Sequence, residues 1–306
     1  MREIQASVIT DTIERLCIEA NQVLPDDIKK SIQACRASED GQIACGILDN
    51  IIENYQIAEN EQVPICQDTG MACVFLEIGQ DVHIAGGDLT EAVNEGVRRG
   101  YTNGYLRKSV VKDPVRRGNT GDNTPAMLYT EIVPGENIKI TVGPKGFGSE
   151  NMSAIRMFKR LPASRESRIL SLKQSKQPDR THVHRWLLAL ESEELLIKLP
   201  FLLRKPLMRP VDSENEDPYY ADLGERNARE DQPAWDRSTG IWRKETAIGL
   251  NIETMPTHIA GMAMCDQHQL PRNTAQNGGD LRWNVILHYH LPKNLRGHSM
   301  QVTPFI

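Results

Sequence analysis

The spacing of hydrophobic and polar positions predicts a helical N-terminal region. Apolar residues recur at helical spacing over residues 4–23 and again over 43–57, which predicts two amphipathic helices. Between them, Pro25 is followed by Asp26 and Asp27. This order predicts a third helix start, because proline suits the first turn and acidic side chains favour the positive end of the helix dipole.

After these helices the pattern changes to one typical of strands. Strand-like stretches lie at residues 63–66, 71–78, 126–133 and 138–142. A Pro134–Gly135 turn separates the last two, and residues 88–99 have a helical pattern. Together they predict a mixed α/β (α+β) fold, in which N-terminal helices are followed by small mixed sheets flanked by helices.

Beyond residue 164, polar and basic stretches alternate with stretches that have a regular pattern of apolar residues. All four tryptophans and seven of the eight histidines lie in this part, much of which is polar and basic. Ordered-looking patterns return at 207–223 and 244–262. A domain boundary would explain one change of pattern, but it would not explain this alternation.

Composition narrows the class of protein. With 306 residues and 39% hydrophobic residues, the chain can form one or two soluble globular domains. A net charge of -5 argues against a nucleic-acid surface, and the longest apolar runs are too short for a membrane span. The N-terminus has no signal-peptide pattern, so we expect a cytoplasmic protein.

The six cysteines do not form a CxxC pair, which argues against a zinc ribbon. Cys17, Cys35 and Cys45 lie within helix-like patterns and are expected to be small buried residues. Cys66 is different, because it lies in the polar segment PICQDTG at residues 64–70. This turn can present a thiolate as a metal ligand with Asp68 as an acid or base, or it can be a strand end capped by Asp68.

Two further glycine-rich segments follow, RRGNTGDNTP at 116–125 and PKGFGSENMS at 144–153. Neither matches a phosphate-binding loop or a dinucleotide fingerprint. Each can be a structural turn, or the two can form a site for a small polyanion. Arg107, Arg116, Arg117 and Lys145 supply positive charge that suits carboxylates.

The segments CQDTG, GNTGDNTPA and KGFGSENMS, in this order, resemble the alpha subunit of class I fumarases and L-tartrate dehydratases. LMRP at 207–210 and NIETMPTHIAG at 251–261 extend the resemblance. The resemblance is continuous to about residue 164, and after that it is limited to the two regions that contain these segments.

The resemblance implies reversible dehydration of a hydroxy-dicarboxylate, malate to fumarate or L-tartrate to oxaloacetate. Family members hold a [4Fe–4S] cluster on three cysteines, and its open iron acts as a Lewis acid. A beta subunit, which is the implied partner, carries the catalytic base. By resemblance, Cys66 is a cluster ligand, Gln67, Asp68 and His258 are catalytic, and Arg107, Lys145, Gly146, Gly148 and Ser149 bind substrate.

The chain departs from this family at the other two cluster cysteines. The family has one in a CPP segment, whose position falls near His182, and one in a CHA segment near the C-terminus. Cys265 comes too early for the second, and its context does not match. We therefore expect the irregular blocks to be frameshifted translation.

Codon degeneracy allows this explanation. Codons for residues 264–273 can be chosen so that the next frame spells CAINISCHAT, and the shifted frame of 165–205 can contain CPPVVVGVGIGG. Residues 224–243 can likewise spell a family-like segment. The expected organisation is a catalytic domain over 1–280, with 165–205, 224–243 and 263–280 frameshifted, and a read-through tail over 281–306.

Two other functions stay open at this point. If the second half is genuine, the chain is a non-catalytic binding or assembly module with structural cysteines. A zinc hydrolase would need His182 and His184 as metal ligands, and both lie in the segment 165–205 that is expected to be frameshifted. If the blocks are frameshifted, this translation is expected to be an inactive hydro-lyase subunit.

Overall fold

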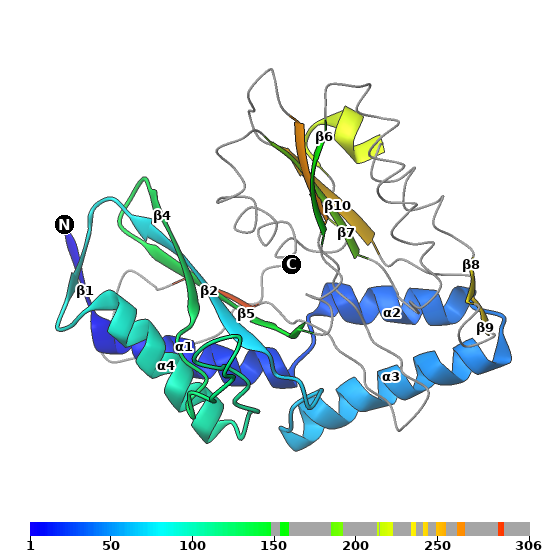
Figure 1. Ribbon diagram of the computed structural model, residues 1–306, viewed down its shortest axis with the longest axis horizontal. Coiled ribbons are helices and arrows are strands. Elements are labelled where there is room, and N and C mark those ends of the chain that lie inside the picture. Colours follow the sequence, from blue (N-terminus) through cyan, green and yellow to red (C-terminus); the bar gives the residue numbers. More distant parts are fainter. Residues whose placement is uncertain are drawn as a thin grey trace. The chain divides into compact units, whose positions relative to one another are not determined.

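The computed structural model describes residues 1–147, 213 and 215–222 in full, together with the backbone of seven later strands. The chain divides into two compact units (Figure 1). The first contains residues 1–23, 61–147 and 284–306, and the second contains residues 24–60 and 148–283.

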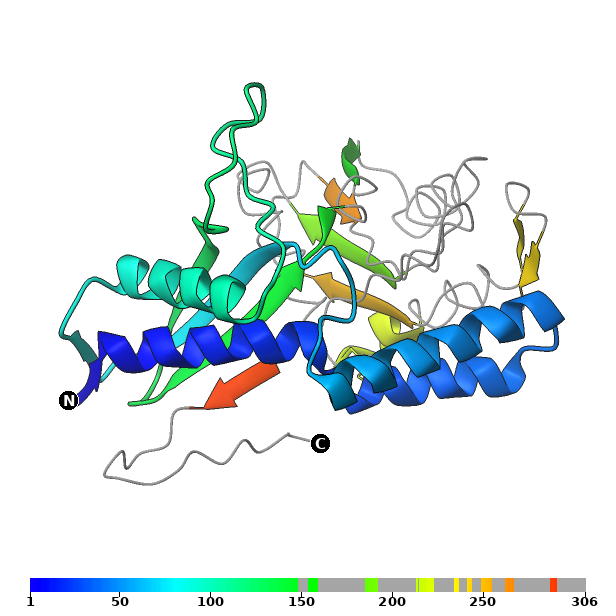
Figure 2. The ribbon, with the colours of Figure 1, turned by 90° about the horizontal axis from the view of Figure 1, so that it is seen from below.

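The first unit is a sheet covered on one face by two helices. The sheet has the order β12-β5-β2-β4, and a two-stranded parallel sheet pairs β1 with β3. Helices α1 and α4 lie side by side against the larger sheet (Figure 2). The bounds are β1 Arg2–Gln5, α1 Ala6–Gln22, β2 Met71–Gly79, β3 Val82–Ala85, α4 Leu89–Asn103, β4 Met127–Val133, β5 Ile138–Lys145 and β12 Leu287–His290.

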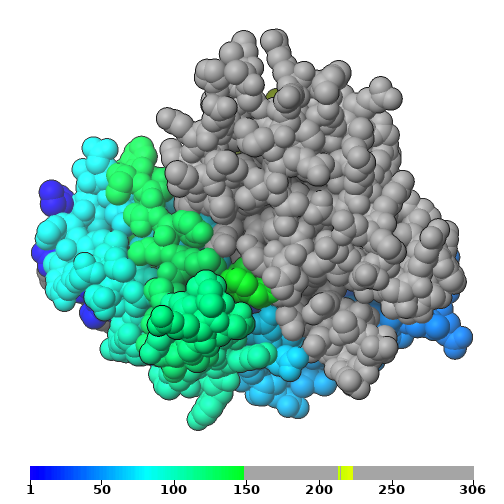
Figure 3. All heavy atoms as spheres, viewed as in Figure 1, coloured from blue at the N-terminus to red at the C-terminus, as the bar shows by residue number. Residues whose placement is uncertain are grey.

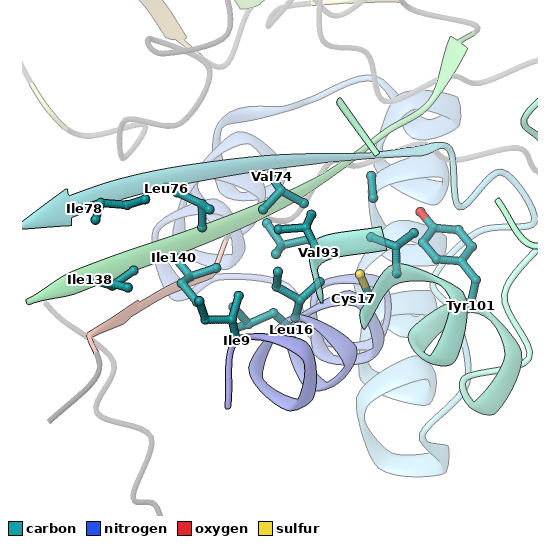
Figure 4. Packing of buried hydrophobic residues seen from close by; sticks show 14 of the residues in the cluster. Ile9, Leu16, Cys17, Val74, Leu76, Ile78, Val93, Tyr101, Ile138 and Ile140 are labelled. Atoms are coloured by element: carbon teal, nitrogen blue, oxygen red, sulfur yellow. The ribbon is translucent and has the colours of Figure 1, made fainter. Parts of the chain in front are cut away.

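The core of this unit forms where the apolar stripe of α1 meets alternate residues of the sheet (Figure 4). Ile9 and Leu16 come from α1, and Val74, Leu76 and Ile140 come from β2 and β5. All five are at most 2% exposed. Complete burial of such a side chain contributes about 1.5–3 kcal/mol, so this cluster is a main source of the unit's stability.

Small residues let the two helices approach closely. A methyl group on Gly96 would lie 2.7 Å from the Thr10 carbonyl oxygen, and one on Gly100 would lie 2.7 Å from the Cys17 Cβ. The Thr10 hydroxyl donates to the Ala92 carbonyl across the same contact at 2.9 Å. This contact fixes α4, whose C-terminal end leads into the candidate site.

The second unit contains a helical hairpin, α2 (Asp26–Ser38) and α3 (Gln42–Glu61, whose last residue belongs to the first unit). Buried residues of the two helices include Ile32 and Tyr55, and Arg36 forms an ion pair with Asp49. The unit also has a sheet of order β10-β7-β11-β6 and a β8-β9 pair. Their bounds are β6 Ala154–Phe158, β7 Arg185–Glu191, β8 Ala234–Asp236, β9 Ile241–Arg243, β10 Gly249–Thr254 and β11 Met262–Asp266.

The predicted mixed α/β fold class is confirmed. The predicted helices correspond to α1 to α4, and the Pro25 helix start is confirmed because α2 begins at Asp26. Among the described residues, no helix is long and apolar enough to cross a membrane. Cys17 is buried as expected, whereas Cys35 and Cys45 are only partly buried.

The strand predictions are correct at some positions and wrong at others. β2, β4 and β5 match, but residues 63–66 form no strand, because the Ile65 amide donates to the Asn21 carbonyl rather than to a sheet partner. β4 and β5 are not neighbours despite the short turn between them. β2 lies between them, parallel to β4 and antiparallel to β5.

Candidate active site

The Cys66–Gly70 turn is anchored to the end of α1. The Ile65 amide donates to the Asn21 carbonyl at 2.8 Å, and the Gln22 side chain donates to the Gln62 carbonyl at 2.8 Å. Asn21 in turn donates from its amide side chain to the Cys17 carbonyl at 2.8 Å. The turn therefore begins at a fixed point on the helix that also builds the core.

Within the turn, backbone amides face the thiol and the carboxylate. The Asp68 amide points at the Cys66 Sγ at 3.4 Å, and the Gly70 amide donates to the Asp68 Oδ1 at 3.2 Å. Cys66 and Asp68 are partly buried, whereas Gln67 is exposed. Asp68 thus caps the turn, although the strand that was expected to end there is absent, and its other carboxylate oxygen faces Gly146.

The start of the second glycine-rich segment closes over this turn. Gly146 lies so close that a methyl group on it would be 3.0 Å from the Asp68 Oδ2. Lys145 is buried, and its ammonium donates to the Gly146 carbonyl at 3.2 Å. Gly70 has a φ of 64° and packs against the Lys145 carbonyl. The sequence-predicted residues Asp68, Lys145 and Gly146 are therefore neighbours.

Arg107 is joined to the turn through its backbone. The Thr69 hydroxyl donates to the Arg107 carbonyl at 3.0 Å, while the Arg107 side chain is exposed. The Tyr101 hydroxyl, at the end of α4, donates to the Thr69 carbonyl at 2.7 Å. Burial raises the pKa of Tyr101 well above its ordinary value, so the phenol stays protonated and remains a donor.

Residues 107–122 form a basic arm that projects from the first unit (Figure 2) and points toward the viewer in Figure 3. A bridge pairs Val111 with Asn119, and the Asn119 side chain donates to the Lys108 carbonyl at 2.9 Å. Arg116 and Arg117 are exposed on this arm. Guanidinium groups suit carboxylates, because they can donate two parallel hydrogen bonds to one carboxylate. The arm can therefore contribute charge for an anionic ligand.

Asp122, at the base of the arm, gives a prediction for the dependence of stability on pH. Burial alone would raise its pKa, but hydrogen bonds from the Thr124 hydroxyl and amide, and from Arg98, outweigh this and lower it to about 2. The folded state therefore prefers the carboxylate. This contribution is complete above about pH 4, where an unfolded aspartate is ionised, and it disappears as the pH falls to about 2.

We expect Asp122→Asn to remove this dependence. Urea unfolding at pH 6 and at pH 3 should show a smaller loss of stability in the variant than in the parent. The difference should be about 1 kcal/mol after allowance for solvent screening. Asp11→Asn is a suitable control, since Asp11 is mostly exposed. An equal pH dependence in parent and Asp122→Asn would contradict the prediction.

The thiols near the turn do not fit a cluster held by three cysteines. Burial, with a smaller contribution from Glu14, raises the pKa of the Cys17 thiol to about 12, and Cys73 is 4% exposed within the core. The buried Cys17 thiol therefore disfavours the thiolate form that binds iron. In the part of the chain that the structure describes, no group of three or more His, Cys, Asp or Glu side chains could hold a metal ion.

Some predicted site residues lie outside the described residues, namely Gly148, Ser149 and His258. Conversely, the structure reveals two supports of the turn that the sequence interpretation did not single out, Tyr101 and Asn123. Asn123 lies within GNTGDNTPA, so the motif contained the signal, but its amide side chain was not distinguished from a loop residue that faces solvent.

Comparison with known proteins gives matches to one family. The model described as "Fumarate hydratase (Fumerase)" matches residues 10–188. A Methanocaldococcus jannaschii protein named "Putative L(+)-tartrate dehydratase subunit alpha" is 39% identical over 157 residues, which are 49% of this chain and 55% of that protein. An Escherichia coli "Fumarate hydratase class I, anaerobic" is 37% identical over 102 residues, 33% of this chain and 18% of the relative.

A third relative, the Escherichia coli "L(+)-tartrate dehydratase subunit alpha", is 24% identical over 143 residues, which cover 46% of this chain and 47% of its own length. The chain thus spans about half the length, or less, of these curated relatives. The family model, by contrast, matches more than half of the chain. The chain belongs to the fumarate hydratase family, which includes the alpha subunits of L(+)-tartrate dehydratases.

Proposed function

We propose that the gene encodes the alpha subunit of a hydro-lyase that dehydrates a hydroxy-dicarboxylate, malate or L-tartrate, together with a beta subunit. The observation that carries the proposal is the Cys66–Gly70 turn, where a thiol, the Asp68 carboxylate and the backbone of Arg107 are joined within one hydrogen-bonded unit. Relatives named as tartrate dehydratase alpha subunits support the substrate class and the partner.

In this proposal the chain's own residues bind and orient the dicarboxylate. Arg107 and the basic arm neutralise its carboxylates, because guanidinium groups pair with them bidentately. Asp68 is held by the Gly70 amide and transfers a proton at its carboxylate. Gln67, exposed beside it, contacts the substrate. Lys145 and Gly146 border the carboxylate of Asp68, and Gly148, Ser149 and His258 complete the proposed set.

The cofactor of the family enzyme is proposed to be a [4Fe–4S] cluster with Cys66 as one ligand. The chain as written does not fit that group, because the cysteines expected in the CPP and CHA segments are absent from it. We therefore propose that the reading frame is shifted over 165–205, 224–243 and 263–280, with a read-through tail over 281–306. This translation is accordingly proposed to be inactive.

Turnover by the frame-restored protein tests the function. The gene is resequenced, and the restored chain is co-expressed with the beta-type reading frame expected beside it. Formation of fumarate from malate, or of oxaloacetate from L-tartrate, is then followed by absorbance. We expect turnover of one of the two substrates, and Asp68→Asn should lower kcat about a hundredfold or more.

The matched control is Asp11→Asn, which removes a surface carboxylate on α1 that pairs with Arg99 and should leave kcat unchanged. A restored alpha–beta pair that carries its full iron content and turns over neither substrate would refute the proposed function. A native-frame DNA sequence over the three blocks would refute the frameshift alone.

A further inference from the structure

Asn123 is a fully buried polar residue at the centre of three chain segments. It is 0% exposed and has a φ of 63°, a conformation that asparagine tolerates better than most residues. Its Oδ1 accepts from the Ser109 amide at 2.7 Å and from the Val110 amide at 3.2 Å. Its Nδ2 donates to the Gly70 carbonyl at 3.1 Å. Both ends of the side chain are therefore used.

These three bonds join the turn to the segment that carries Arg107. Ser109 lies two residues after Arg107, and the Thr69 hydroxyl independently donates to the Arg107 carbonyl at 3.0 Å. The hydrogen bonds of Thr69 and those of Asn123 hold the same two segments side by side. The separation of the turn from the backbone of Arg107 is therefore fixed at two points.

The Gly70 carbonyl receives a second buried donor. The Tyr101 hydroxyl, at 1% exposure, lies 3.3 Å from the Gly70 carbonyl and 2.7 Å from the Thr69 carbonyl. Tyr101 is held by the packing of α4 against the core. The Thr69 and Gly70 carbonyls are thus held from α4 by Tyr101, and the Gly70 carbonyl is also held from the loop at Asn123.

We propose that Asn123 is a positioning residue, which with Tyr101 sets the geometry of the Cys66–Gly70 turn relative to Arg107. The inference rests on the proposed function, because it assigns Asn123 the role of setting the distance between the Asp68 carboxylate and Arg107, the proposed carboxylate-binding arginine. An amide side chain suits this role because it accepts from one segment and donates to the other at the same time. An aspartate would accept but could not donate when ionised.

Amide hydrogen exchange of the full-length chain tests the proposal, read by mass spectrometry in two peptides. One spans residues 64–72, and the other spans residues 108–112. Asn123→Ala should speed exchange in both peptides about tenfold, because it removes buried bonds on both sides. Asn123→Asp and Tyr101→Phe should speed exchange in 64–72 alone, because each removes a donor to the turn and leaves an acceptor for the Ser109 and Val110 amides in place.

Val97→Ala is the matched control, since Val97 is 0% exposed in the core and makes none of these bonds. It should lower the melting temperature while leaving the ratio of exchange between the two peptides unchanged. If Asn123→Ala does not fold, Asn123→Asp and Tyr101→Phe still decide the question. Unchanged exchange in 64–72 in both of these variants, or a rise equal to that in the helices of the core, would overturn the proposal.

Exchange requires neither substrate nor cluster. A chain that catalyses nothing can therefore still show the selective pattern, in which case the positioning role holds and the proposed function fails by its own assay. If the frame-restored chain is active but the variants speed exchange without selectivity, the proposed function holds and the positioning role of Asn123 fails.

Discussion

Replacing Gly70 by alanine should cost the protein about 3 kcal/mol or more of folding stability. Gly70 has a φ of 64°, which a residue with a Cβ adopts only with strain. In addition, the new methyl group would overlap the carbonyl group of Lys145 and lie 2.7 Å from the Gly146 amide nitrogen. These are backbone atoms, so no side-chain rotation can relieve the contact.

The sheet prevents the backbone from moving aside. Met71, the next residue, pairs with Lys145 at the end of the β2–β5 ladder. Separating Gly70 from Lys145 would therefore break the pairing at that end of the ladder and displace the Gly70 carbonyl from Tyr101 and Asn123. Urea unfolding followed by circular dichroism measures the loss of folding stability. Amide hydrogen exchange in residues 64–72 shows whether the disturbance lies at the turn.

Two other glycines provide graded controls. A methyl group on Gly118 would meet no atom within 4 Å, so Gly118→Ala should change stability by less than about 0.5 kcal/mol. Gly121 is equally open but has a φ of 89°, so Gly121→Ala should cost about 1 kcal/mol through backbone strain alone. If Gly70→Ala were no worse than Gly121→Ala, the close packing against Lys145 would not matter.

The sequence predicted the helices and the central strands because their patterns are local. α1 and β2 each carry a periodic apolar face, and burial of that face is what stabilises them. The pairing of the strands could not be predicted in the same way. β4 and β5 are joined by a tight turn, yet β2 separates them, and this order depends on contacts between segments far apart in the sequence.

The candidate site shows the same division between local and long-range information. Cys66 and Asp68 were recognised because the CQDTG segment is a contiguous motif, and the turn bonds between them are local. The roles of Tyr101 and Asn123 depend on contacts 31 and 53 residues away along the chain, respectively. A buried asparagine and a loop asparagine look alike in a sequence, because burial is a property of the fold.

Anaerobic reconstitution of this chain with iron and sulfide should yield less than about 0.1 cluster per chain. A [4Fe–4S] cluster on three protein ligands needs three thiolates that converge, and the turn offers Cys66. Cys17 is buried in the apolar core, where burial raises its pKa and disfavours the thiolate, and Cys73 is also buried. Visible absorbance of the iron–sulfur cluster, together with iron and sulfide analysis, measures the occupancy.

The frame-restored chain is the decisive comparison. Under the proposed frameshift it would keep residues 1–164 unchanged, so that the Cys66 turn and its supports would be the same in both proteins, and it would regain the two cysteines of the CPP and CHA segments. We expect about one cluster per restored chain, and Cys66→Ser in that chain should lower occupancy at least about tenfold. Full occupancy in the unrestored chain would instead mean that Cys66 acts with ligands other than those two cysteines. The proposal that the frameshift prevents cluster binding would then be wrong. Because both proteins share the turn, a difference between them can be attributed to the restored blocks, which carry the two cysteines, rather than to the sequence around Cys66.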